Sequence, residues 1–286
     1  MPAPSLGRFA SVLLLLAASA APAAPQGPAQ QGPLSAEERE LVRTLAEQGV
    51  QLEPRAGLAA IAATVEVVDD LLEYLLVGPG GARHETVFTT EVRASVLNVA
   101  LLSLGAEPGR NATWTLKDPP PSEEEQREGA SPYDITAPQG PGFYLYAGWR
   151  RGEESFFFRA EDLVRNLATG QTMRRHRWVY LGSRMLPTGR AGGSGGGAEE
   201  FAADVYQNLV NIAWFSDGNT LLTGALPECL EQSIWMSNAW LLPARGSSVL
   251  FVFSRERQER APAELAALLP DVGPALSPYE LEALGR

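Results

Sequence analysis

The chain has two histidines, so few of its side chains can do acid–base or metal chemistry near neutral pH. His84 is followed directly by Glu85, and His176 lies in a later part of the chain. Two imidazoles and a carboxylate can bind zinc or iron, which gives one hypothesis: a metal-assisted hydrolase that uses His84, Glu85 and His176. The H-E-x-x-H pattern is incomplete, because Phe88 stands where its second histidine belongs. The alternative is that His84 caps the turn after Gly81 and His176 lies at a strand edge. We therefore assign no catalytic residue, no metal ligand and no cofactor.

Hydroxyl and thiol nucleophiles have equally little support from the pattern. A serine hydrolase would need a histidine beside Ser183 and a third group to orient it, and the spacing nominates no such group. A G-x-S-x-G sequence around Ser194 lies among further glycines, without the strand and helix that would position its hydroxyl. The single cysteine, Cys229, is interpreted as a small buried side chain. The candidate binding residues are His84, Glu85, His176, Trp178, Ser183 and Arg184.

Aromatic side chains are the other chemical resource of this sequence. Burying a large apolar side chain stabilises a fold by about 1.5–3 kcal/mol, so most of the aromatic residues are expected in the core. Trp235 and Trp240 follow a turn and show less regular alternation than the others. This pair is therefore the candidate for lining a groove that binds peptide or carbohydrate.

The elements that must position these residues are clearest between Leu71 and Gly109. Apolar alternation predicts a strand over residues 71–77, glycines 80 and 81 predict a turn, and residues 85–90 suit a returning strand. The apolar positions of Arg93–Leu104 recur with helical spacing around much of the girth, which is typical of a helix packed on a sheet. Gly105 predicts the end of that helix.

Local signals elsewhere predict further strands and short helices. Ser35 and Glu38 form a capping box that starts a helix. Glu161 and Asp162 fall in the first turn of a predicted short helix over residues 160–167, where they complement its dipole. Asp217-Gly218 predicts a type I′ hairpin. The expected fold is α+β: a largely antiparallel or mixed β-sheet of eight or more strands, one buried helix packed on it, and short peripheral helices.

Several segments carry a family resemblance. They are LLEYLLV at residues 71–77, HETVF at 84–88, LGAEPG at 104–109, RHRWVYLGSRM at 175–185 and the run 201–222. Together they resemble the YdjY-type domain of exported bacterial proteins, planctomycete ones especially, over roughly residues 50–258. The resemblance implies no established activity. Iron–sulfur binding, described for some relatives, needs clustered cysteines, and this chain has one. The family pattern also has histidine where this chain has Val96 and Asn98.

Changes in composition along the chain predict how it divides into segments. Residues 1–23 have the apolar run and small-residue cleavage site of a signal peptide, with a retained membrane anchor as the alternative. Residues 24–34 are expected as a disordered tether, 35–258 as one YdjY-like domain, and 259–286 as a peripheral tail. Within the domain, residues 118–141 are expected as an exposed Pro-rich and acidic loop, and 187–198 as a Gly-rich loop.

A formal net charge of −11 argues against nucleic-acid binding, which requires a concentrated positive surface. The sequence therefore favours an exported, periplasmic or extracellular protein with no transmembrane segment after cleavage. Its predicted role is non-catalytic binding of a protein or small-molecule ligand, and the metal-assisted hydrolase is the alternative. A purely structural role at the cell surface is not separated from binding, and the pattern does not predict the oligomeric state.

Overall fold

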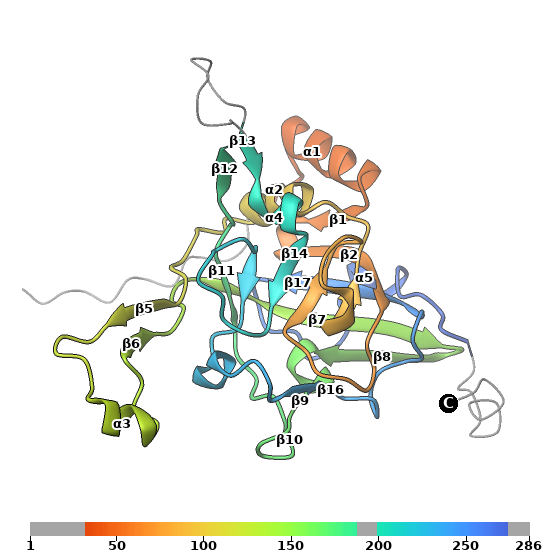
Figure 1. The fold of residues 1–286 in the computed structure, drawn as a ribbon. Coiled ribbons are helices and arrows are strands. Elements are labelled where there is room, and N and C mark those ends of the chain that lie inside the picture. Colours follow the sequence, from red (N-terminus) through yellow and green to blue (C-terminus); the bar gives the residue numbers. More distant parts are fainter. Residues whose placement is uncertain (1–31, 188–198, 274–286) are drawn as a thin grey trace, which may run out of the picture. The chain divides into compact units, whose positions relative to one another are not determined.

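The computed structural model describes residues 32–187 and 199–273 (Figure 1). The predicted signal peptide and most of the predicted tether lie outside these residues, as do most of the Gly-rich loop and the last part of the tail. The end of the tether, Gly32–Leu34, is described. The Arg55 side chain donates to the carbonyl oxygens of Gly32 and Pro33 at 3.1 and 3.3 Å.

The main element is a 10-stranded mixed sheet. Eight of its strands form a closed ring in the order β2-β17-β7-β11-β15-β14-β3-β4, because β4 also pairs with β2. The strands β1 and β8 pair with the outside of this ring, on β2 and β7. The ten strands are β1 (Val50–Glu53), β2 (Leu58–Val65), β3 (Tyr74–Val77), β4 (Thr86–Thr89), β7 (Gly142–Arg151), β8 (Glu154–Arg159), β11 (Trp178–Tyr180), β14 (Asn208–Asn211), β15 (Leu222–Thr223) and β17 (Ser248–Ser254).

Three smaller sheets and short helices complete the described part. The sheets are β10 (Gln171–Thr172) with β9 (Val164–Asn166) and β16 (Trp235–Ser237), β12 (Met185–Pro187) with β13 (Glu199–Phe201), and β5 (Thr113–Leu116) with β6 (Tyr133–Thr136). The α-helices are α1 (Ala36–Glu47), α2 (Ala94–Ser103), α3 (Glu123–Arg127), α4 (Ala202–Tyr206) and α5 (Ala263–Ala266), and the 3₁₀ turns are η1 (Pro54–Ala56), η2 (Arg83–Glu85), η3 (Ala160–Leu163) and η4 (Pro227–Leu230).

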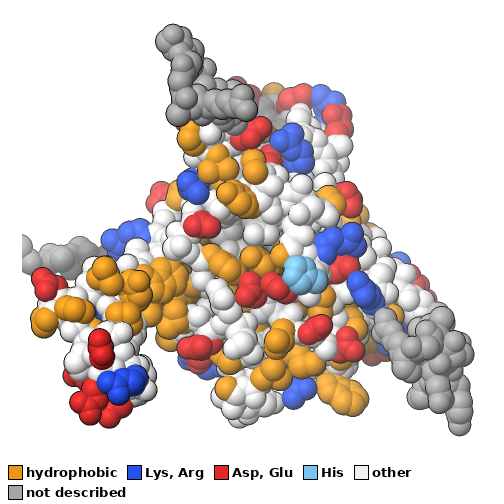
Figure 2. Space-filling view, viewed as in Figure 1, with side chains coloured by type: hydrophobic (Ala, Val, Ile, Leu, Met, Phe, Trp, Pro, Cys, Tyr) orange, Lys and Arg blue, Asp and Glu red, His pale blue; other side chains and the backbone are white. Residues whose placement is uncertain are grey.

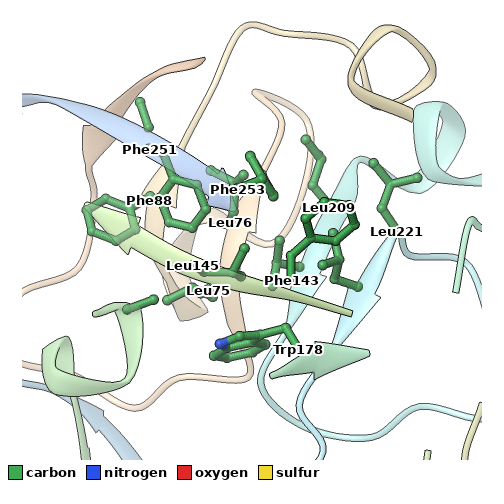
Figure 3. Close-up of a cluster of buried hydrophobic side chains, with 14 of the residues drawn as sticks. Leu75, Leu76, Phe88, Phe143, Leu145, Trp178, Leu209, Leu221, Phe251 and Phe253 are labelled. Carbon is green, nitrogen blue, oxygen red and sulfur yellow. The ribbon is translucent and has the colours of Figure 1, made fainter. Parts of the chain in front are cut away.

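Large apolar side chains from the ring strands fill the core (Figure 3). Leu75, Phe88 and Trp178 are completely buried there, although they come from strands far apart in the sequence. The tryptophan proposed as a binding residue is therefore a core residue. A second, smaller cluster contains Leu265 and Leu269 from the predicted tail, so the described part of that tail packs on the sheet.

The mixed sheet confirms the broad fold prediction, but the single buried helix is not observed. Helix α2 buries Leu97 and Leu101 and leaves Val99 exposed, so its apolar residues do not all face the core. Helix α1 packs on β1, and α4 packs on α2, so other helices also cover the sheet. The α1 start is as predicted, since Ser35 Oγ accepts from the Glu38 N–H at 3.1 Å.

Two predicted antiparallel turns are instead crossover connections. The strands β3 and β4 pair in parallel, and so do β14 and β15. Gly218 has a left-handed φ of +65°, as the Asp-Gly turn requires, but the turn lies within the crossover. The conformation of a turn depends on neighbouring residues in the chain. The direction in which two strands pair depends on where each strand lies in the closed sheet. None of the helices in residues 32–187 and 199–273 has the length and apolar character needed to cross a membrane.

Candidate functional site

His84 lies in η2 on the surface, with 78% of its side chain exposed and its Nε2 3.0 Å from the Glu85 carboxylate. Burial, together with the neighbouring Glu85 carboxylate, raises the pKa of Glu73 above its ordinary value. Burial also raises the pKa of Tyr74 to about 12, and the charges of Glu73 and Glu85 add to that effect. This cluster is a carboxyl pair beside an exposed imidazole.

His176 lies in a different environment, with only 8% of its side chain exposed. Its Nδ1 lies 3.1 Å from the Arg174 carbonyl oxygen and 3.6 Å from a carboxylate oxygen of the fully buried Glu161. Burial lowers the pKa of His176, which favours the neutral imidazole. In the described ranges, no group of three or more His, Cys, Asp or Glu side chains could hold a metal ion. His84, Glu85 and His176 therefore form no shared metal site there.

The remaining predicted residues are committed to structural contacts. Ser183 has φ of +59°, and its Oγ accepts from the Ala203 N–H at 3.1 Å. The Arg184 Nε donates to the Asn219 side-chain oxygen at 2.9 Å. The Trp178 ring contacts the His176 ring, with 4.8 Å between centroids and an interplanar angle of 36°. These contacts hold Ser183 against α4, Arg184 against the segment between β14 and β15, and His176 against the core.

Trp235 and Trp240, which were predicted to line a groove together, lie in different environments. Trp235 is buried in the core, whereas Trp240 is 87% exposed to solvent, so the two rings have opposite environments. Cys229 is fully buried, and burial raises the pKa of its thiol to about 12. A thiol in that state is not nucleophilic at neutral pH.

The structure contains a groove that the sequence interpretation missed. It has a volume of about 420 Å³ and opens between the β5–β6 hairpin and the segment after β14. In Figure 2, hydrophobic side chains gather over β5 and β6 and the neighbouring surface. We call this feature the aromatic groove; its lining residues are Trp114, Tyr133, Trp214, Phe215, Ser216 and Gln232.

Hydrogen bonds and ring contacts fix one wall of the aromatic groove. The Trp214 indole N–H donates to the Gly224 carbonyl oxygen at 2.8 Å. Phe215 stacks on Tyr74, with centroids 5.3 Å apart and an interplanar angle of 2°. The Asn111 side chain donates to the Phe215 carbonyl oxygen at 2.7 Å and so holds the base of the hairpin against this wall. The groove is therefore pre-formed.

The other wall is the β5–β6 hairpin, whose second strand lies within the predicted exposed loop at residues 118–141. Register pairs Trp114 with Ile135 and Leu116 with Tyr133, so these four side chains share one face of the hairpin. Alternation in TWTL at residues 113–116 and in YDIT at 133–136 carries this information in the sequence. The second strand was missed, because the acidic residues before it made residues 118–141 resemble a solvated loop.

No protein-family model, curated protein or solved structure matches the chain.

Proposed function

We propose that this chain is a non-catalytic binding domain whose ligand lies in the aromatic groove. The observation that carries the proposal is a pre-formed groove of about 420 Å³ with four aromatic side chains in its lining. Ligand sites are typically lined by apolar and aromatic groups with a few polar groups that fix orientation. Ser216 and Gln232 supply polar groups of this kind.

The lining of the groove limits the chemistry of the ligand. None of its lining residues carries a charge, so the groove suits a flat apolar or aromatic surface. A tryptophan or phenylalanine side chain of a peptide has such a surface, and so does the apolar face of a sugar ring.

Binding is favoured over catalysis because the reactive groups have other contacts. His176 is buried against Glu161, and Cys229 is a buried thiol with a raised pKa. Ser183 accepts a backbone hydrogen bond, and no histidine orients it among its contacts in residues 32–187 and 199–273. Substrate turnover by the purified protein, abolished by a substitution of His84, would contradict this.

Export is part of the same proposal. The apolar run and small-residue cleavage site in residues 1–23 support it, as does the resemblance to exported YdjY-type domains. Expression in a bacterial host, followed by fractionation and N-terminal sequencing, tests this part. Protein that stays in the cytoplasm with residues 1–23 attached would refute it.

The groove itself is tested by calorimetric titration with aromatic N-acetyl amino-acid amides and with neutral oligosaccharides. Tyr133→Ala is expected to weaken binding about tenfold, since removing one partly buried aromatic ring costs about 1.5 kcal/mol. Trp240→Ala is the matched control, because Trp240 is exposed and lies outside the groove lining. Equal affinities of wild type and Tyr133→Ala for every ligand that binds would refute the proposal.

A further inference from the structure

The apolar face of the β5–β6 hairpin continues beyond the part that the core covers. Trp114 and Ile135 pack against the main core at the base of the hairpin. Leu116 and Tyr133, the next pair along the same face, are 65% and 40% exposed. Exposed apolar side chains that continue a binding groove are a common mark of an interaction surface. The uncovered half of the face is therefore part of the same site.

The hairpin ends in a strongly acidic helix. Six carboxylates and two cations lie between the start of β5 and the end of β6. Helix α3 begins with a capping box, in which Ser122 Oγ accepts from the Glu125 N–H at 3.3 Å. Figure 2 shows the acidic side chains gathered on α3, with a single basic patch beside them. We call α3 and the following Glu128 the acidic tip.

The carboxylates of the acidic tip are largely unpaired. Glu125 is used by the capping box, whereas Glu123, Glu124 and Glu128 are exposed and form no ion pair within residues 32–187 and 199–273. Three unpaired carboxylates on one short element create a local negative potential, which attracts cations and steers their approach. The Leu116–Tyr133 pair is the last strand pair of the hairpin before the connecting segment that contains this element.

We propose that the aromatic groove and the acidic tip together bind a polypeptide segment of another protein, in which a large aromatic side chain lies near lysines or arginines. The inference rests on the proposed function and names the partner class of the same groove. The aromatic anchor enters the uncharged groove, and the cations face Glu123, Glu124 and Glu128. A neutral glycan makes no use of the tip, and a second copy of this chain, with a net charge of −11, is repelled by it.

The test uses three synthetic peptides and fluorescence anisotropy on the whole protein. The first peptide has one tryptophan flanked by arginines, the second replaces the tryptophan by alanine, and the third replaces the arginines by glutamines. The first is expected to bind at least about tenfold more tightly than either other peptide at low salt, and to lose that advantage over the glutamine peptide as salt increases.

Charge is tested by the triple variant Glu123→Gln, Glu124→Gln, Glu128→Gln, which keeps the capping-box residue Glu125. The triple variant is expected to bind the arginine peptide about tenfold more weakly and to bind the glutamine peptide with unchanged affinity. The control, which removes the same charge elsewhere, combines Glu153→Gln, Glu154→Gln and Glu264→Gln. These residues are exposed in the β7–β8 turn, at the start of β8 and in α5. Circular dichroism checks that each variant is folded.

The outcomes separate this inference from the proposed function. If Tyr133→Ala weakens binding but the triple variant behaves like its control, the groove binds and the cationic partner class is wrong. The inference also fails if none of the peptides binds, or if sedimentation shows a dimer that Tyr133→Ala disrupts. If Tyr133→Ala changes the affinity of no ligand, the proposed function fails as well.

Discussion

Replacing Glu161 by alanine tests whether a buried ion cluster is required for the fold. The Glu161 side chain is fully buried and accepts hydrogen bonds from the Arg159 Nε and the His176 backbone N–H, each at 3.0 Å. Arg159 is itself buried, with 7% of its side chain exposed. Removal of the carboxylate would leave a guanidinium charge in the interior without its counter-ion.

The expected loss of stability depends on the contacts that Arg159 retains in the variant. Breaking a buried ion pair from one side typically costs about 3–5 kcal/mol of the free energy of unfolding. Arg159 retains its hydrogen bond to the His176 carbonyl oxygen and lies over the rings of Tyr144 and Tyr146, at 5.0 and 5.5 Å from their centroids. These remaining contacts favour the lower end, about 3 kcal/mol. A loss of this size lowers the Tm by about 6–12 °C in a domain of this length.

The adjacent residue provides the control. Asp162 also pairs with an arginine, and its two carboxylate oxygens accept from Arg175 at 2.9 and 2.8 Å. Arg175 has 54% of its side chain exposed, so Asp162→Ala is expected to cost about 0.2–1 kcal/mol. Equilibrium urea unfolding, followed by tryptophan fluorescence, measures both variants. If Glu161→Ala and Asp162→Ala lower the free energy of unfolding equally, burial does not determine how much the Arg159–Glu161 pair contributes to stability. That result would refute the prediction.

Three further predictions concern packing and pH. Leu97→Ala is expected to lower the free energy of unfolding by about 2–5 kcal/mol and Leu102→Ala by less than about 0.5 kcal/mol, because Leu97 is buried and Leu102 is exposed. Similar losses for the two variants in urea unfolding would contradict the assigned buried face of α2. Burial holds the pKa of His176 below its ordinary value of 6.5, so the unfolded chain binds a proton that the folded chain does not. The free energy of unfolding should therefore fall as the pH drops through about 6.5, and fall less steeply in His176→Gln; an unchanged slope would refute this. Burial and the Glu85 carboxylate raise the pKa of Glu73, so the ionised Glu73 destabilises the folded protein at pH 7. Glu73→Gln should therefore raise the Tm at pH 7 and raise it less at pH 4, where Glu73 is largely protonated. An equal gain in Tm at both pH values would contradict this interaction.

Local features of this fold could be predicted from the sequence alone. The capping box at Ser35 depends on residues three positions apart, and the apolar alternation of the strands depends on nearest neighbours along the chain. The same alternation in residues 113–116 and 133–136 contained one wall of the aromatic groove. The second strand of that wall was overlooked, because the helix before it is acidic and residues 118–141 resemble a solvated loop.

Tertiary structure alone decided which strands pair and which polar groups are buried. Glu161 was expected in the first turn of a short helix, where it complements the helix dipole, and the structure buries it against Arg159. The groove forms only when the hairpin meets Trp214 and Phe215, about a hundred residues away in the chain. Short-range hydrogen bonds and periodicity fix turns and helix ends, whereas burial and pairing direction depend on closing the sheet. Closure brings together segments that share no local pattern, so it leaves no signal in any one stretch of the sequence.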